Sequence, residues 1–125
     1  MKVLVTGGAG FIGSAVIRYL IKEKRINVVN IDCLTYSGNL LSLEEVNRDD
    51  LYSFRKIDIS DSEKLRIVFE EEQPNAVINL AAESSVDRSI ESPSKFIETN
   101  IVGTYTLLEE TRYYWEKLES TKKKE

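Results

Sequence analysis

The segment from Thr6 to Gly13 reads Thr-Gly-Gly-Ala-Gly-Phe-Ile-Gly, and its residue types and spacing are suited to binding phosphate. Gly7, Gly10 and Gly13 fit Gly-x-x-Gly-x-x-Gly, and with Gly8 in place of Gly7 the run also fits Gly-x-Gly-x-x-Gly. Early glycines permit a tight turn, and a later one lets the backbone approach a pyrophosphate. The N-terminus of a following helix offers free N–H groups to the anion. The pattern predicts a dinucleotide site; the alternative is a glycine-rich turn without a ligand.

Two aspartates follow predicted strands at one edge of the same sheet. Asp32 comes about 19 residues after Gly13, where a carboxylate can accept hydrogen bonds from the adenosine ribose hydroxyls. The same carboxylate would repel the 2′-phosphate of NADP, so the sequence favours NAD as the cofactor. Asp58 and the backbone of Ile59 are placed to meet the adenine. A solvated or helix-capping role remains the alternative for both aspartates.

A dinucleotide site requires secondary-structure elements that bring the glycine segment and the two aspartates together. The spacing of apolar residues predicts strands that alternate with helices. Strands are expected at 2–6, 27–31, 51–58 and 76–81, and helices at 11–24, 41–46, 62–72 and from Pro93 onward. Loops are expected at 32–39 and 83–92. This alternation predicts the α/β class: a partial Rossmann fold with a parallel sheet of about four strands, order 3-2-1-4, flanked by helices.

The final helix carries apolar residues at helical spacing. The predicted stripe consists of Ile97, Ile101, Tyr105, Leu108, Tyr114, Trp115 and Leu118. We assign residues 1–120 to one nucleotide-binding domain and residues 121–125 to a charged tail. The stripe on the C-terminal helix is a candidate surface for a homodimer.

Composition narrows the function classes. A chain of 125 residues with 42% hydrophobic and 30% charged residues suits one globular domain. Its net charge of −4 gives no footprint for nucleic acid, and no apolar run reaches the roughly 18 residues that span a membrane. Glycines interrupt the apolar stretch of the first 20 residues, which argues against a signal peptide. With one cysteine and no histidine, we expect a cytoplasmic protein without a metal site.

Four further segments carry a family resemblance. They read Asp-x-Leu-Thr-Tyr-x-Gly-Asn-Leu at 32–40, Asp-Ile at 58–59, Leu-Ala-Ala-Glu-Ser-x-Val-Asp-Arg-Ser at 80–89 and Phe-Ile-x-Thr-Asn-Ile-x-Gly-Thr at 96–104. With them the chain resembles the extended short-chain dehydrogenase/reductase superfamily, and more narrowly the N-terminal third of the dTDP-glucose 4,6-dehydratase family. The glycine motif marks only the superfamily, whereas the segments at 34–39 and 81–89 are closer to the dehydratase signature. One departure is Ser85, where the family often has His.

The resemblance implies NAD as the cofactor and a nucleotide sugar as the substrate of the full-length family. Together with the glycine motif it implies the following cofactor-binding residues: Gly7, Gly10, Phe11, Ile12, Gly13, Asp32, Cys33, Leu34, Thr35, Gly38, Asp58, Ile59, Leu80, Ala81, Ala82, Ser84 and Thr99. Ser84 would also face the sugar nucleotide. The family helix that corresponds to the one after Pro93 helps to form a homodimer.

The implied reaction has three steps: NAD takes a hydride from the sugar C4, water leaves across C5 and C6, and the hydride returns to C6. An Asp–Glu pair and a Tyr-x-x-x-Lys pair serve this chemistry in the family, and both follow later strands. We therefore expect no catalytic residue in this chain and no activity of the chain alone. Half a doubly wound sheet should bind NAD more weakly than a whole one.

Several residues have the types and spacing of catalytic groups, but we expect none of them to be catalytic. Tyr113 and Lys117 spell Tyr-x-x-x-Lys, but a helix from Pro93 would carry Tyr113 about 30 Å from its start, beyond reach of a cofactor at that end. For Glu83 and Asp87 we expect a structural or sugar-positioning role. Cys33 is expected to be an unreactive, partly buried thiol, and Asn100 to tie the helix to the neighbouring strand.

Other functions stay open at this point. A UDP-sugar epimerase, dehydratase or decarboxylase of the same superfamily would share the glycine loop. A non-catalytic NAD-sensing module, or one piece of a split enzyme completed by a separate chain, would share the whole cofactor half. The fourth predicted strand would be an edge, and its apolar run invites pairing or aggregation.

Overall fold

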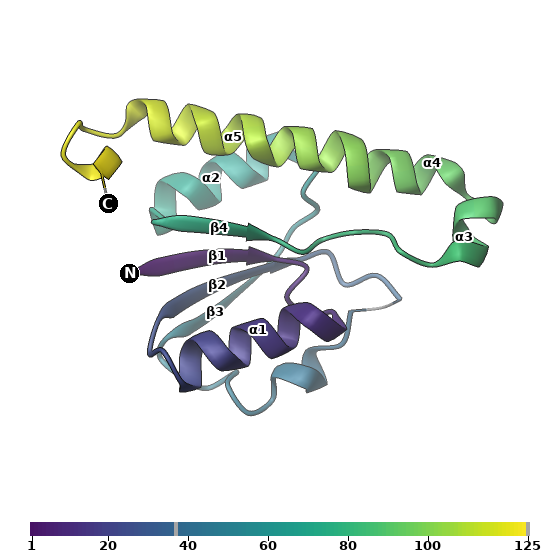
Figure 1. The fold of residues 1–125 in the computed structure, drawn as a ribbon, viewed down its shortest axis with the longest axis horizontal. Helices are drawn as coiled ribbons and strands as arrows, with labels where there is room; N and C mark the ends of the chain where they lie inside the picture. Colours follow the sequence, from purple (N-terminus) through teal and green to yellow (C-terminus); the bar gives the residue numbers. More distant parts are fainter. Residues whose placement is uncertain (37, 125) are drawn as a thin grey trace.

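Four parallel strands form one sheet in the computed structural model, which describes residues 1–36 and 38–124 (Figure 1). The strands are β1 (Lys2–Thr6), β2 (Asn27–Asp32), β3 (Tyr52–Lys56) and β4 (Ala76–Asn79), in the order β3-β2-β1-β4. The predicted fold class and strand order are confirmed. Ser37 in the predicted loop and Glu125 in the predicted tail lie outside the described residues.

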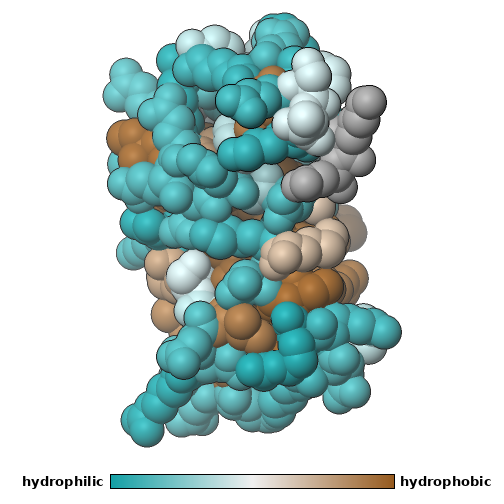
Figure 2. Space-filling view, turned by 90° about the vertical axis from the view of Figure 1, so that its left-hand side faces the viewer, coloured by the Kyte–Doolittle hydropathy of each residue, from teal (hydrophilic) through white to brown (hydrophobic). Residues whose placement is uncertain are grey.

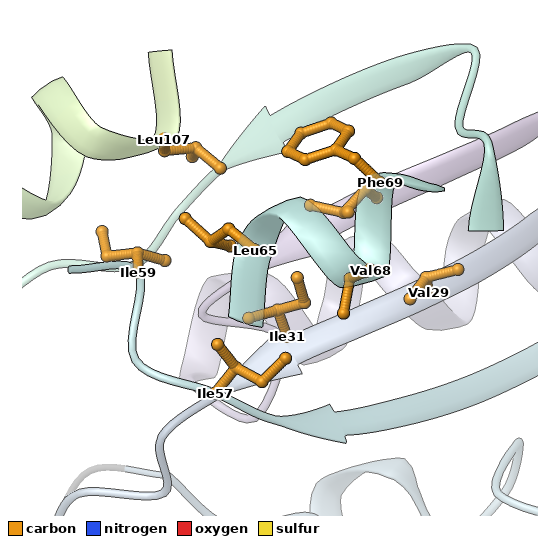
Figure 3. Close-up of a cluster of buried hydrophobic side chains, with 9 residues drawn as sticks. Val29, Ile31, Ile57, Ile59, Leu65, Val68, Phe69 and Leu107 are labelled. Atoms are coloured by element: carbon orange, nitrogen blue, oxygen red, sulfur yellow. The ribbon is translucent and has the colours of Figure 1, made fainter. Parts of the chain in front are cut away.

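Helices cover both faces of the sheet (Figure 1). Helix α1 (Phe11–Lys22) lies on one face, and α2 (Ser62–Glu72) and α5 (Thr104–Lys117) lie on the other. Successive strand side chains point to opposite faces, so Val3 and Val5 join the cluster under α1 while Leu4 joins the cluster under α2. Figure 3 shows the second cluster, to which α2, α5, the strands β1 and β2 and the segment after β3 all contribute.

The segment 83–92, expected to be a loop, contains the short helix α3 (Val86–Glu91). This prediction was wrong because α3 has no buried residue, and so no apolar periodicity marks it. The expected helix at 41–46 is a 3-10 turn at Leu40–Leu43. At the C-terminus, Lys122–Lys124 form a further 3-10 turn.

The long helix after Pro93 has three parts. It begins as α4 (Pro93–Phe96), continues as a π-helical segment at Ile97–Gly103 and ends as α5. A π turn holds more residues than an α turn, so it rotates the residues that follow relative to a regular helix. Leu107 is thereby buried in the core and Tyr114 packs against Phe69, with 5.3 Å between ring centroids.

Most of the predicted stripe points away from the core. Ile97, Ile101, Tyr105 and Leu108 are 53–64% exposed.

Seen from the amino-terminal ends of the strands, hydrophobic residues form a band between hydrophilic regions above and below (Figure 2). None of the helices in the described part of the chain has the length and apolar character needed to cross a membrane.

Candidate cofactor-binding site

A cavity of about 440 Å³ opens at the carboxyl ends of the strands. Each strand contributes the residues that follow it, because parallel strands all end at this edge. The sheet order reverses beside β1, and such a switch point is where doubly wound sheets bind ligands. The lining residues are Gly7, Gly10, Ile31, Asp32, Cys33, Thr35, Tyr36, Gly38, Ile57, Asp58, Ile59, Leu80, Ala81, Ala82, Glu83, Arg88, Lys95, Glu98 and Thr99.

The glycine loop is packed so closely that side chains would not fit. Gly7 has a φ of +66°, and a Cβ built on it would lie 2.6 Å from the backbone of Leu80 and Ala81. A Cβ on Gly13 would lie 2.1 Å from the carbonyl oxygen of Gly7. Helix α1 therefore starts directly against the loop, with Gly10 as its N-cap. The first N–H groups of this helix have no partner within it, and they are available to an anion.

Asp32 fixes the loop from the neighbouring strand. Its Oδ2 accepts a hydrogen bond from the backbone N–H of Ala9 at 2.9 Å, and its Oδ1 accepts one from Leu34 at 2.8 Å. A carboxylate has about four acceptor positions, so two further hydrogen bonds can still be accepted. The carboxylate thus both holds the two loops and lines the cavity.

Asp58 lines the cavity and does not cap α2, so the helix-capping alternative for this residue was wrong. Its Oδ1 accepts hydrogen bonds from the backbone N–H and the hydroxyl of Ser60, at 2.9 and 2.8 Å. Asp58 and Ile59 also line the cavity. The cap of α2 is Asp61, whose side chain accepts from the backbone N–H of Lys64 at 3.1 Å.

The wall after β4 is held by two side chains from other elements. The buried Thr6 hydroxyl donates to Asn79 at 2.5 Å and accepts from the backbone N–H groups of Leu80 and Ala81 at 3.2 Å each. Asn100 exchanges two hydrogen bonds with the backbone of Glu83, at 2.8 and 2.9 Å. Asn100 therefore ties the helix to the loop that follows β4, and not to the strand itself as predicted.

Most of the predicted cofactor residues meet at this cavity, and five lie beside or outside it: Phe11, Ile12, Gly13, Leu34 and Ser84. Phe11 and Ile12 have exposed side chains, at 94% and 65%, so only their backbone would serve a phosphate. Gly13 is buried beneath the loop, and Leu34 adopts a positive φ of 57° beside Asp32. Ser84 is exposed.

Cys33 lies in the cavity wall and is exposed, which corrects the expectation of a partly buried residue. Partial desolvation of the thiol and the negative charges of Asp58 and Asp32 raise its pKa above the ordinary value. A thiol with a raised pKa carries less thiolate at neutral pH, which agrees with low reactivity.

Sequence reasoning left six lining residues out of the site: Ile31, Tyr36, Ile57, Arg88, Lys95 and Glu98. Ile31 and Ile57 directly precede the two aspartates, so their place follows from the strand ends. Tyr36 and Arg88 meet across the cavity, with the guanidinium carbon 3.5 Å from the ring centroid. They are 52 positions apart in the sequence, and no local pattern signals their contact.

The tyrosine–lysine pairs lie away from the cavity. Tyr113 and Lys117 are on α5, with the Lys117 ammonium 4.1 Å from the Tyr113 ring centroid. A second Tyr-x-x-x-Lys, which the sequence analysis overlooked, is formed by Tyr52 and Lys56 in β3. None of these residues lines the cavity. Within the described part of the chain, no group of three or more His, Cys, Asp or Glu side chains is placed to hold a metal ion.

The chain is similar to a protein family and to curated enzymes. Residues 4–124 match the family model described as GDP-mannose 4,6 dehydratase. A dTDP-glucose 4,6-dehydratase from Salmonella typhimurium is 58% identical over 98% of this chain and 34% of its own length. Another, from Escherichia coli strain K12, is 57% identical over the same shares. The chain spans about a third of the length of the curated relatives it matches.

Solved structures share the fold. A dTDP-glucose 4,6-dehydratase from Streptomyces venezuelae, solved with NAD bound, is 42% identical with a TM-score of 0.85, over 91% of this chain and 36% of that one. The enzyme of the same name from Bacillus anthracis, in complex with NAD, is 38% identical with a TM-score of 0.81, over 92% and 34%. A UDP-glucose 4-epimerase from Thermotoga maritima, solved with UDP-glucose, is 38% identical with a TM-score of 0.81, over 91% and 35%.

Proposed function

The chain belongs to the GDP-mannose 4,6 dehydratase family, and from this we propose that its cavity binds NAD as the cofactor half of a nucleotide-sugar dehydratase. The observation that carries the proposal is a juxtaposition. The open N-terminus of α1, the glycine loop and the Asp32 carboxylate border one cavity. A dinucleotide needs this combination, because its diphosphate is anionic and its ribose offers hydroxyl donors.

The residues present fit that cofactor. The loop at Gly7 and Gly13 leaves no room for side chains, so the diphosphate can approach the backbone. Asp32 would accept hydrogen bonds from the adenosine ribose, and Asp58 and Ile59 would border the adenine. Leu80 and Ala81 would lie under the dinucleotide. Bound NAD would accept and return a hydride.

NAD is proposed rather than NADP because of the charge beside the ribose. Asp32 is held in place by two backbone N–H groups, so it cannot easily swing away from a 2′-phosphate. A fixed carboxylate next to a dianionic phosphate is repulsive.

The substrate and the reaction are proposals that rest on the curated relatives. We propose a dTDP-sugar as the substrate, since the similar curated proteins are dTDP-glucose 4,6-dehydratases. A UDP-sugar is the second candidate, because the epimerase solved with UDP-glucose has the same TM-score, 0.81, as the Bacillus anthracis dehydratase. We expect no turnover by these 125 residues alone, because neither tyrosine–lysine pair lines the cavity. We also propose a cytoplasmic setting and a homodimer through the C-terminal helix.

Calorimetric titration with NAD tests the proposal. Asp32→Ala should weaken NAD binding roughly tenfold or more, since it removes charge-assisted hydrogen bonds. Asp49→Ala is the matched control, because Asp49 also accepts a backbone N–H two residues on, from Leu51 at 3.0 Å, but lies outside the cavity. Absence of NAD binding by the folded wild-type chain would refute the proposal, and so would equal affinities of the two variants.

A further inference from the structure

Arg88 and Tyr36 join two walls of the cavity. Tyr36 lies in the segment after β2 and Arg88 in α3, and both line the cavity. The guanidinium carbon is 3.5 Å from the ring centroid, which is the distance of a stacked cation. Stacking uses the face of the guanidinium and leaves its N–H groups free to donate in the plane. Among the described residues, the Arg88 side chain donates no hydrogen bond, so its N–H groups are available to a ligand.

The charge of Arg88 is not balanced by a carboxylate in the described part of the chain. Arg25, Arg55, Arg66 and Arg112 each form an ion pair. Among the described residues, Arg18, Arg48 and Arg88 have no carboxylate oxygen within 4.0 Å, and of these three only Arg88 lines the cavity. The cavity wall contains four carboxylates, those of Asp32, Asp58, Glu83 and Glu98, and two cations, Arg88 and Lys95. An anionic ligand would meet a wall in which these two side chains supply the positive charge.

Several acidic residues lie around Arg88 without forming an ion pair with it. Glu83 and Glu91 line a small pocket together with Arg88 and Lys95. The Asp32 carboxylate accepts from Ala9 and Leu34, and the Asp58 carboxylate accepts from Ser60. Among the described residues, none of these four carboxylates comes within 4.0 Å of the Arg88 guanidinium. An arginine that lies over an aromatic ring and lines a ligand cavity without an ion pair among the described residues is suited to binding a phosphate group.

We infer that Arg88, held by Tyr36, contacts the diphosphate of a nucleotide bound in the cavity. The inference rests on the proposed function and adds a binding residue to it. Two ligands carry this chemistry, the dinucleotide cofactor and a nucleotide sugar, and both are nucleoside diphosphates. The planar guanidinium can donate two hydrogen bonds to phosphate oxygens, and Lys cannot reproduce that geometry.

Titrations of Arg88→Gln with NAD, dTDP and adenosine test the inference. The control is Arg112→Gln, a cation on α5 paired with Glu109 and Glu116 outside the cavity. The diphosphate that Arg88 contacts should bind roughly tenfold more weakly to Arg88→Gln, while adenosine, which has no phosphate, binds as before. Weakening with NAD identifies the cofactor as the source, and weakening with dTDP identifies the sugar nucleotide. Chemical-shift titration measures the weak adenosine constant.

Variants of Tyr36 test the stack. Tyr36→Phe keeps the ring and should bind the diphosphate like the wild type. Tyr36→Ala should weaken this binding in the wild-type chain but weaken it little further in the Arg88→Gln chain. If wild type binds NAD and Arg88→Gln binds both NAD and dTDP as wild type does, the inference alone is overturned. An equal loss for adenosine also overturns it. If wild type does not bind NAD, the proposed function fails and the inference fails with it.

Discussion

Single residues decide how closely α1 approaches the strand end. A methyl group at Gly13 would meet the Gly7 carbonyl oxygen at 2.1 Å, whereas one at Gly10 would meet the same oxygen at 3.2 Å. We expect Gly13→Ala to destabilise the fold by about 1–3 kcal/mol because backbone must move, despite the better helix propensity of alanine. Gly10→Ala should cost less than about 1 kcal/mol. Urea unfolding measures both, and equal midpoints would contradict the packing described.

A second prediction at this scale concerns Cys33, the one cysteine of the chain. Desolvation and the charges of Asp58 and Asp32 raise its pKa, so less thiolate is present at pH 8 than in an unperturbed thiol. Alkylation by iodoacetamide should be slow, with its rate profile displaced to higher pH. Asp58→Asn keeps the Ser60 hydrogen bonds but removes a negative charge, so it should lower the pKa and speed the reaction.

Mass spectrometry follows the Cys33 reaction between pH 7 and 10. Asp61→Asn is the control, because Asp61 caps α2 and is not among the charges that raise the Cys33 pKa. NAD should protect Cys33, which lines the cavity. A profile that Asp58→Asn leaves unchanged would contradict the electrostatic explanation.

At the scale of elements, the π-helical segment sets which side of α5 faces the core. Leu107 is 3% exposed and Leu108 is 63% exposed, so two identical neighbours have opposite environments. Leu107→Ala should cost about 2–4 kcal/mol, because it removes contacts with the core (Figure 3). Leu108→Ala should change stability by less than about 1 kcal/mol. Thermal unfolding compares the two, and a larger loss for Leu108→Ala would place α5 in another rotation.

The local features of the fold could be predicted from the sequence. The glycine loop, the strand before it and Asp32 were found because turn chemistry and apolar runs are local signals. Helix α3 was missed because it buries no side chain, and the π-helical segment because its spacing departs from the helical period. The Tyr36–Arg88 contact depends on where two distant segments meet, which the fold alone determines.

At the scale of the whole molecule, the charged cavity and the apolar groove are lined by different residues. The carboxyl ends of the strands gather the cavity with its charged wall. A second, largely apolar groove of about 580 Å³ runs between β4 and α5, with Val77 and Trp115 among its lining residues. The exposed stripe of Ile97, Ile101 and Tyr105 lies on the same long helix. Such adjoining apolar surfaces favour association with other protein surface.

The stripe predicts self-association of the chain. Ile101 and Tyr105 are 58% and 64% exposed and lie one helical turn apart, so a second copy could cover both. Sedimentation equilibrium should give an average mass that rises above 14.3 kDa with concentration. Ile101→Glu with Tyr105→Glu should return the mass to 14.3 kDa, because association would then bury two carboxylates. The control Ile90→Glu changes an exposed residue on α3 and should not return the mass to 14.3 kDa. A wild-type chain that stays monomeric throughout would exclude the homodimer.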